Sequence, residues 1–364
     1  SSIVLYVLVG FIRGDRRSNE ALMKFFLVGS FSGILILFGA ALLYGLTGST
    51  NLYDHKYILS SFTLYHPIAA VALTMIAAGM GFKLAIAPFH TWAPDTYEGA
   101  PTPITAFISV APKAGAVCVW IRFFLLGLAP LKLQWVLLVA VLSATTLIVG
   151  NLGALHQMNL KRLLAYSSIS HMGYVLMGIC AAALQPLAQT GITLESETQG
   201  FFASVFYMLT YLFFNLGAFA VICLLETRGI APNLQEYRGL GRRSPLLAVM
   251  MSIFMLALAG LPPTSGFPAK FIIFRAALAS RELLWLVIVA GVMTVVALYY
   301  YVKVIYYMWL APADDGAEPL PNIPLSDPQG LAIVITTGAV LLMFIMPTIF
   351  YEFANKSSFL NYSI

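Results

Sequence analysis

Three lysines of this sequence lie inside long apolar stretches, where their residue type points to proton chemistry. Lys83 lies in GFKLAIAPFH, Lys113 in ISVAPKAGAV and Lys270 in GFPAKFIIF. A charged side chain in the middle of a bilayer costs about 3 kcal/mol or more on insertion scales, and desolvation of a lysine favours its neutral amine. A lysine in such a place can therefore take up and release a proton, as a proton relay requires. The alternative is a lysine that only pairs with a neighbouring carboxylate.

The positions of the acidic residues bear on that alternative. All 15 Asp and Glu fall in polar connections or at the ends of apolar stretches. The three lysines are therefore expected to be neutral, to be hydrated, or to pair with a carboxylate outside this sequence. These three possibilities remain open at the level of the sequence.

Two histidines are further candidates for the same chemistry. His171 lies well inside an apolar stretch, in SSISHMGYVLMG, and an imidazole at that depth can pass protons at physiological pH. A hydrogen-bonded packing histidine fits the sequence equally well. His90 follows shortly after Pro88 and is either a ligand in a cavity or a helix cap.

Two apolar stretches, 67–98 and 245–279, are too long for one span and contain helix breakers. The breakers are Pro88 in the first stretch and Pro262, Pro263 and Gly266 in the second. Proline removes a backbone donor, and the freed carbonyls are tolerated at membrane depth only inside protein or beside a water-filled cavity. We therefore expect two broken helices in corresponding places of two inverted repeats, with a site near the midplane. A simple proline kink is the alternative for either stretch.

The composition shows that these elements must lie in a membrane. Of the 364 residues, 60% are hydrophobic and 10% are charged, whereas about 25% of the residues of an ordinary globular domain are charged. So little polar surface cannot cover a water-soluble particle. These values exclude a soluble enzyme, a disordered protein and a disulfide-stabilised secreted domain. Nucleic-acid binding is excluded because the basic residues are few and scattered.

The spacing of the apolar stretches predicts an all-α, polytopic membrane protein with about nine and a half transmembrane helices. An apolar half-span at 1–12, without an initiating Met, indicates that the chain begins within a helix. Further helices are expected at about 21–46, 67–98, 101–128, 133–156, 162–183, 200–226, 245–279, 283–310 and 329–351.

The basic residues predict the orientation of these helices. Most Lys and Arg of the connections lie on one side, in the loops at 13–20, 157–161 and 227–244. By the positive-inside rule these loops face the cytoplasm, and the C-terminus lies on the other side. Three further basic residues near helix ends, Arg122, Arg275 and Lys303, are expected to reach the interface. Lys303 lies in YYYVKVIYYMW, which is typical of an interfacial aromatic belt.

The sequence contains no pattern for a cofactor. Cys118, Cys180 and Cys223 are isolated in apolar stretches, and no Gly-rich phosphate loop follows a strand pattern. We therefore expect no metal, Fe–S, nucleotide or flavin site in this chain.

Three motifs together resemble the antiporter-like subunits of proton-pumping NADH:quinone oxidoreductase (respiratory complex I). They are GFKLAIAPFHTWAPDTYEGAPTPITAFISVAPKAG at 81–115, NLKRLLAYSSISHMGY at 159–174 and AGLPPTSGFPAKF at 259–271. The resemblance covers essentially the whole chain, and subunit N fits best. Lys270 is a lysine where subunit M would have a glutamate, and the chain ends without the long lateral helix expected of subunit L.

The resemblance implies a fold of 14 transmembrane helices with two inverted five-helix repeats. In this chain, residues 1–128 would be the remainder of the first repeat, 129–310 the second repeat, and 311–364 the last helix and tail. The family's protonatable glutamate would lie just upstream of Ser1. Lys83 and Lys270 match the lysines of the two broken helices, Lys113 the connecting lysine, and His171 the histidine of the second repeat.

The resemblance also implies the function and the partners. The chain would move protons along Lys83, Lys113, His171 and Lys270 as part of the complex I membrane arm, in the lipid bilayer of a bacterial inner membrane. NADH, FMN, Fe–S clusters and quinone would bind to partner subunits, and no redox catalysis would occur in this chain. The alternatives are a subunit of a multisubunit Na+/H+ antiporter, a ferredoxin-driven plastid-type relative, and a membrane module whose lysines serve structure alone.

Overall fold

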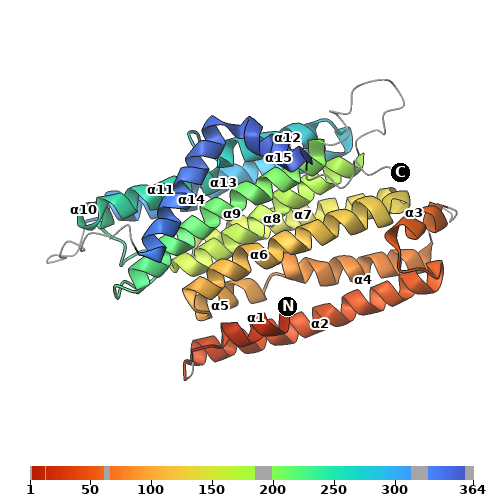
Figure 1. Cartoon of the computed structure of the whole chain (residues 1–364), viewed down its shortest axis with the longest axis horizontal. Helices are drawn as coiled ribbons and strands as arrows, with labels where there is room; N and C mark the ends of the chain where they lie inside the picture. The colour runs from red at the N-terminus through yellow and green to blue at the C-terminus, as the bar shows by residue number, and fades with distance from the viewer. Residues whose placement is uncertain (1, 13, 61–65, 185–198, 313–326, 357–364) are drawn as a thin grey trace.

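In the computed structural model, the long helices run side by side and nearly parallel, forming an all-α bundle (Figure 1). The structure describes residues 2–12, 14–60, 66–184, 199–312 and 327–356. Arg13, most of the polar connection at 311–328 and the tail after residue 356 lie outside these described residues. The helices in chain order are α1 Ser2–Val9, α2 Arg16–Thr47, α3 Leu52–Ser60, α4 Pro67–Leu84, α5 Trp92–Gly99, α6 Thr102–Ile121, η1 Arg122–Gly127, η2 Ala129–Leu131, α7 Lys132–Leu155, α8 Leu160–Leu184, α9 Gln199–Glu226, α10 Leu240–Arg243, α11 Pro245–Ala259, α12 Gly266–Leu278, η3 Arg281–Leu283, α13 Leu284–Trp309, α14 Pro328–Ile345 and α15 Pro347–Lys356.

Within the described residues, eight helical segments are long and apolar enough to cross a membrane, and the shorter apolar helix α11 adds to them. This confirms the all-α membrane class and the predicted series of spans. The observed α2 begins before the predicted residue 21, because the Asp15 side chain accepts a hydrogen bond from the Arg17 amide and caps the helix.

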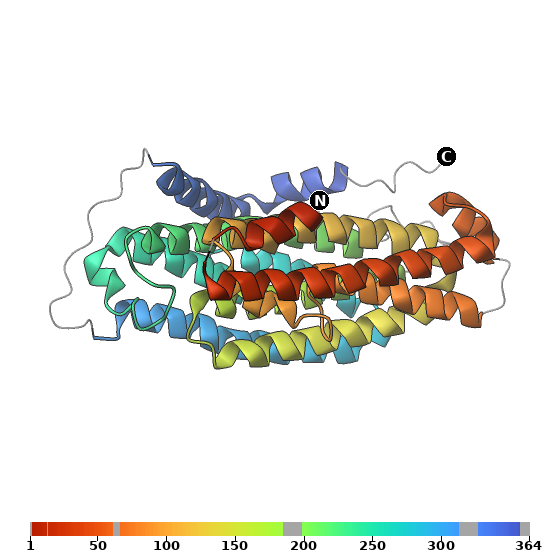
Figure 2. The same cartoon turned by 90° about the horizontal axis from the view of Figure 1, so that it is seen from below.

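Three local features differ from the prediction. The short helix α3 was not expected, and the end of the predicted helix 101–128 is a π-helix at Arg122–Gly127. The predicted helix 329–351 is two helices. It ends as α14 at Ile345, and α15 restarts with Pro347 at its first position, where proline needs no hydrogen-bond acceptor for its nitrogen. Figure 2 shows α15 at a marked angle to α14.

Both predicted helix breaks are present. The first break separates α4 from α5, and Ala85, the residue that ends α4, has a left-handed backbone with φ of 57°. The second break separates α11 from α12, and Gly260 ends α11 with φ of 83°. A left-handed residue at this position closes a helix end, so each break begins with a proper helix terminus rather than a kink.

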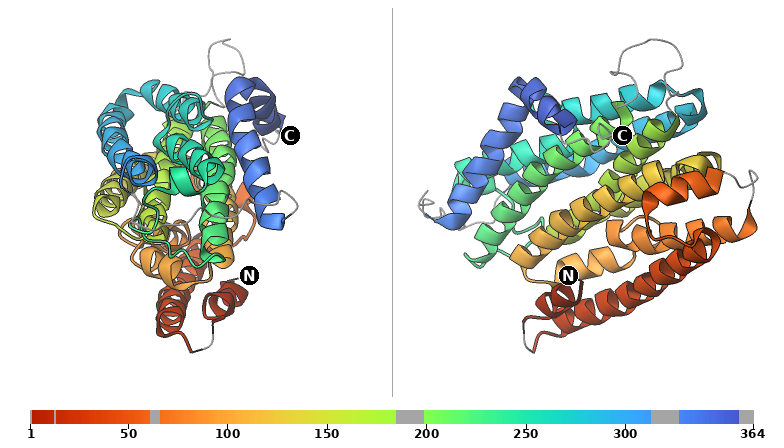
Figure 3. Two further views of the ribbon diagram at one scale, coloured as in Figure 1. Left: turned by 90° about the vertical axis from the view of Figure 1, so that its left-hand side faces the viewer. Right: turned by 45° about the vertical axis from the view of Figure 1, so that its right-hand side comes forward.

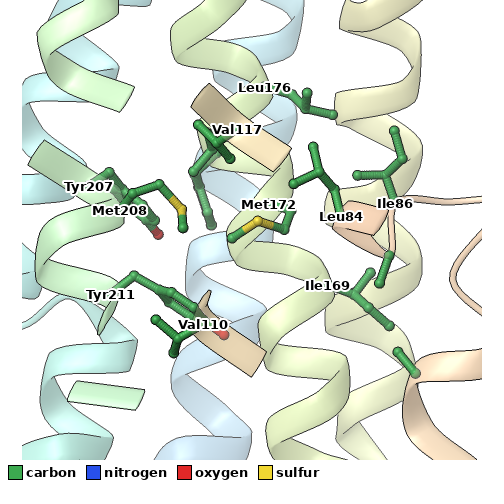
Figure 4. Packing of buried hydrophobic residues seen from close by; sticks show 14 of the residues in the cluster. Leu84, Ile86, Val110, Val117, Ile169, Met172, Leu176, Tyr207, Met208 and Tyr211 are labelled. Atoms are coloured by element: carbon green, nitrogen blue, oxygen red, sulfur yellow. The ribbon is translucent and has the colours of Figure 1, made fainter. Parts of the chain in front are cut away.

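Helix α8 lies in the interior of the bundle, where it packs against α7, α9, α5 and α12 (Figure 3). From Leu163 to Ala181, all but one of its residues are buried. Figure 4 shows its apolar side chains Ile169, Met172 and Leu176 between Tyr207 and Tyr211 of α9 on one side and the α4 break on the other. The polar residues of α8 therefore lie in a low-dielectric interior, where hydrogen-bond partners matter most.

Candidate functional site

Lys113 is fully buried on α6, at 0% exposure. Its Nζ donates a hydrogen bond to Oγ of Ser168 on α8 at 2.5 Å and lies 5.8 Å from the centre of the Tyr97 ring. The Ser168 hydroxyl also accepts a hydrogen bond from Tyr211 of α9 at 2.7 Å. The lysine thus contacts a hydroxyl and an aromatic face, neither of which carries a counter-charge.

His171 is buried on α8, close to one turn beyond Ser168, and both of its ring nitrogens face tyrosine hydroxyls. Nδ1 lies 2.6 Å from the hydroxyl of Tyr207 on α9, and Nε2 lies 3.2 Å from the hydroxyl of Tyr301 on α13. Lys113 bonds to Ser168, three residues before His171, and Lys270 lies against the ring of Tyr174, three residues after it. The histidine is therefore hydrogen-bonded on both sides and lies on α8 between the contact points of the two lysines.

Lys270 lies on α12, directly beyond the second break, and is 6% exposed. Its Nζ donates to the carbonyl of Ala259 at 2.8 Å, and it lies 5.1 Å from the centre of the Tyr174 ring. Ala259 is the last residue of α11, so the ammonium sits at the negative end of a helix dipole. Gly260 makes this approach possible, because a Cβ there would lie 2.6 Å from Cδ of Lys270.

The other predicted residues of the second break shape the chain around Lys270. Pro262 and Pro263 lie in the connection between α11 and α12, and Gly266 begins α12. A Cβ on Gly266 would lie 1.8 Å from the carbonyl oxygen of Ala257. Only glycine therefore allows α12 to start this close to the end of α11.

The first break does not place its lysine in the same way. Lys83 lies in the last turn of α4 and is exposed on the surface of this chain, so the structure does not bring it together with the other three groups. Pro88 lies in the connection, and His90 lies just before α5 and is half-buried. The carbonyl of Phe82 accepts a hydrogen bond from the Ala85 amide at 2.9 Å and a second one from the indole nitrogen of Trp92 at 3.1 Å.

The hydroxyl groups around the lysines and His171 were missed at the level of the sequence. They are Ser167, Ser168 and Tyr174 of α8, Tyr207 and Tyr211 of α9, and Tyr301 of α13. On α8 and α9 they recur at spacings of three and four residues, in SSISHMGY and YMLTY. That spacing puts side chains on one helix face, and it could have predicted from the sequence that these hydroxyl groups lie near His171.

The assignment of the tyrosine-rich stretch on α13 to an interfacial belt is wrong for two of its members. Tyr300 and Tyr301 are buried at 0% and 1% exposure, while Tyr299 and Tyr306 are exposed. A helix that packs on one side and faces lipid on the other divides consecutive tyrosines between the two surroundings. Composition alone could not separate them.

A second polar cluster lies near the start of α8 and was also not predicted. Asp95 of α5 accepts a hydrogen bond from Lys24 of α2 at 2.6 Å and one from Arg162 of α8 at 2.7 Å. Arg162 also donates to Glu98 of α5 at 2.9 Å. Helix α5 is not one of the eight candidate spans. Burial alone would raise the pKa of the Asp95 carboxyl, but the hydrogen bonds from Lys24 and Arg162 outweigh it and hold the pKa below its usual range.

Lys161, next to this cluster, is buried at 5% exposure. Its Nζ donates to the carbonyl of Ala100 at 2.7 Å and lies 3.9 Å from the carboxylate of Glu226, which in turn accepts a hydrogen bond from Thr102. This pair ties the ends of α8 and α9 to the start of α6.

The ion pairs in which both partners are described residues involve Lys24, Lys161 or Arg162. In that part of the chain, no carboxylate pairs with Lys83, Lys113 or Lys270. The two basic loops after α7 and α9 contact each other, because the Leu160 amide donates to the Pro232 carbonyl at 2.7 Å. They therefore lie at the same end of the bundle, as the positive-inside argument expects.

No group of three or more His, Cys, Asp or Glu that could hold a metal ion occurs among the described residues. The three cysteines are free: Cys118 is exposed, Cys180 is buried and Cys223 is intermediate.

Comparison with known proteins gives consistent matches over most of the chain. A family model described as NADH:quinone oxidoreductase/Mrp antiporter, transmembrane, matches residues 1–297. NADH-quinone oxidoreductase subunit N 1 of Herpetosiphon aurantiacus is 41% identical over 359 residues, which are 97% of this chain and 70% of the relative. Subunit N of Trichlorobacter lovleyi is also 41% identical, over 98% of this chain and 70% of its own.

A solved structure shows the same fold. A chain of respiratory complex I from Thermus thermophilus superposes with a TM-score of 0.75 at 32% identity, over 96% of this chain and 72% of that chain.

Proposed function

Because the chain belongs to the transmembrane family of NADH:quinone oxidoreductase and Mrp antiporter subunits, we propose that it is a proton-translocating subunit of the complex I membrane arm, of the subunit N type. The single observation that carries this proposal is that two buried lysines, Lys113 and Lys270, contact α8 three residues before and three residues after His171. A merely structural membrane module has no need for buried amines without acidic partners.

The proton path would run along Lys83, Lys113, His171 and Lys270. Lys113 and His171 support it most directly, because hydroxyl groups on α8 and α9 surround both of them. Lys83 would be the group of the first broken helix, and the residues of the two breaks, Pro88, His90, Pro262, Pro263 and Gly266, would give the path its shape. Residues 1–128 and 129–310 would form the two repeats, and 311–364 the last helix and tail.

Lys113 and Lys270 have no acidic partner among the residues that the structure describes, which suits a mechanism of charge coupling. Desolvation favours the neutral amine, whereas a carboxylate brought close favours the ammonium. The protonation of Lys113 and Lys270 would therefore respond to charges that move in neighbouring subunits. Electron transfer from NADH to quinone would occur in those partners, which would hold the FMN, the Fe–S clusters and the quinone, and this chain would contribute proton transfer alone.

The membrane would be a bacterial inner membrane. The basic loops around residues 157–161 and 227–244 would face the cytoplasm, as the positive-inside rule predicts, and the C-terminus would lie on the opposite side. A subunit of a multisubunit Na+/H+ antiporter is a second candidate, because the family model covers both kinds of protein. The 41% identity to subunit N favours the first candidate.

The test is Lys113→Ala in the complete complex, purified and reconstituted into liposomes, with Lys56→Ala as the matched control. Lys56 lies exposed on α3. We expect Lys113→Ala to lower NADH-driven proton transport about 100-fold while the control transports normally. Unchanged proton transport in Lys113→Ala would refute the proposal. Transport that needs Na+ but no electron donor would favour the antiporter.

A further inference from the structure

Three consecutive tyrosines on α13 place their hydroxyl groups in three different environments. Tyr299 is 62% exposed on the outer face of the helix. Tyr300 is buried and donates to Oδ1 of Asn151 on α7 at 2.9 Å, and its hydroxyl also contacts that of Tyr301. Tyr301 is also buried, but it points to α8, because consecutive residues of a helix differ by about 100° in direction. The structure thus provides three chemically identical side chains of which only one faces the histidine.

The hydroxyl of Tyr301 joins two groups of α8. It lies 3.2 Å from Nε2 of His171 and 2.5 Å from Oγ of Ser167. The other imidazole nitrogen, Nδ1, lies 2.6 Å from the hydroxyl of Tyr207. His171 is 1% exposed, and both of its nitrogens are occupied by phenolic hydroxyls. Any proton that reaches or leaves this imidazole in the present geometry must therefore pass through a tyrosine.

We propose that Tyr301 is a proton-relay residue, the hydroxyl through which His171 exchanges its proton, with Ser167 as the next group along the chain. This inference rests on the proposed function and adds to it a residue outside the lysines and the histidine. A hydroxyl both donates and accepts a hydrogen bond. Tyr301 can therefore pass a proton between two groups without a stable charged intermediate on its own oxygen.

The transfer balances at every atom. The Ser167 hydroxyl gives its proton to the Tyr301 oxygen as the Tyr301 proton moves to Nε2 of His171. The proton on Nδ1 of His171 then moves to the Tyr207 oxygen as Tyr207 gives its own proton to a water molecule or hydroxyl on its other side. One O–H or N–H bond thus forms for each one that breaks, and nothing is oxidised or reduced. Ser167 regains a proton from the next donor on its side.

The groups His171, Tyr301 and Ser167 form one branch of the proposed proton path, and the helices that hold them give its direction. Ser167 precedes His171 by about one turn and is therefore closer to the start of α8, where the loop at 157–159 lies. Two residues beyond Tyr301, the ammonium of Lys303 donates to the carbonyls of Leu155 and Gln157 at 3.4 and 3.3 Å. The Tyr301 branch thus leads from His171 toward the end of the bundle that carries the basic loops.

The test compares Tyr301→Phe with Tyr300→Phe and Tyr299→Phe in the complete complex, reconstituted into liposomes. Each change removes one hydroxyl and keeps the ring. Assembly is checked by subunit content and by NADH oxidation with a water-soluble acceptor. We expect Tyr301→Phe to lower proton transport per assembled complex at least about tenfold, while the exposed control Tyr299→Phe retains most of it. Tyr300→Phe, which removes only a neighbour of the Tyr301 hydroxyl, should lose less than Tyr301→Phe. Ser167→Ala, which removes the other partner of Tyr301 without touching the ring, should also lower transport, and it decides the matter if Tyr301→Phe does not assemble.

The outcomes separate this inference from the function on which it rests. Normal transport in an assembled Tyr301→Phe complex, or an equal loss in Tyr299→Phe, would overturn the relay, because an equal loss in the exposed control would trace the defect to α13 as a whole. If Lys113→Ala abolishes transport while Tyr301→Phe does not, the proposed function stands and the relay fails. If both variants transport normally, the proposed function itself fails.

Discussion

Ser167 and Ser168 are neighbours on α8, yet their hydroxyls bind different helices. Ser168 accepts a hydrogen bond from Lys113 of α6, whereas Ser167 bonds to Tyr301 of α13. One dipeptide therefore connects the buried lysine on one side of α8 to the tyrosine and histidine on the other. This explains why two small polar residues occur side by side in an otherwise apolar interior.

The first prediction concerns Ser168→Ala. The change removes the acceptor of both Lys113 and Tyr211, so the buried ammonium loses its hydrogen-bond partner, and a charged buried donor without a partner is strongly disfavoured. We expect proton transport per assembled complex to fall about tenfold, measured with a pH-sensitive dye inside the liposomes. Ser204→Ala is the matched control, because Ser204 is equally buried but bonds only to backbone carbonyls of α8 and α9. Equal rates in the two variants would contradict the role of Ser168.

The second prediction concerns the close approach at the second break. Gly266→Ala places a Cβ 1.8 Å from the Ala257 carbonyl oxygen, so α12 must shift away from α11. We expect a loss of about 1–3 kcal/mol in stability, seen as a lower melting temperature in detergent. Gly291→Ala on α13 is the control, because no atom lies within 4 Å of the position its Cβ would take. If both variants melt like the parent, the packing of the break is not as close as described.

The third prediction concerns pH and the Asp95 cluster. The native pKa of Asp95 lies below its usual range, so its contribution to stability is complete above the ordinary Asp value of about 4 and is lost as the pH falls through the native value. Asp95→Asn should therefore lower the melting temperature at pH 7, and the difference from the parent should shrink on acidification. The control is Glu282→Gln, because Glu282 is an exposed carboxylate near the other end of the bundle. This variant should melt at the same temperature as the parent. A pH-independent effect of Asp95→Asn would show that the carboxylate does not act through its charge.

The sequence predicted the membrane class, both breaks and the depth of Lys113, His171 and Lys270, because each depends on local apolarity and on residues such as proline. It did not predict which side chains meet. The hydroxyl network around His171 needs the relative rotation of α8, α9 and α13, and the Asp95 cluster needs the contact of α2, α5 and α8. Lys83 shows the same limit. The sequence predicted that it lies within an apolar stretch, but its exposure depends on which face of α4 packs against the rest of this chain.

The last prediction separates two ways of closing a broken helix. Across the first break, Trp92 donates to the carbonyl of Phe82, and across the second, Lys270 donates to the carbonyl of Ala259. The Phe82 carbonyl also accepts a bond from the Ala85 amide at 2.9 Å, whereas Lys270 serves the carbonyl at the end of α11, which is costly to leave unpaired in an apolar interior. Trp92→Phe should therefore destabilise the protein by about 1 kcal/mol, and Lys270→Met by about 1–3 kcal/mol.

Only Lys270 adds an ionisable group to this structural role. Trp92→Phe should consequently retain proton transport per assembled complex, whereas Lys270→Met should lose it. The measurement is the ratio of proton transport to assembled complex for the two variants, alongside their melting temperatures in detergent. If Lys270→Met keeps the transport ratio of Trp92→Phe, the lysine serves only to close the break, and the proton path must bypass α12.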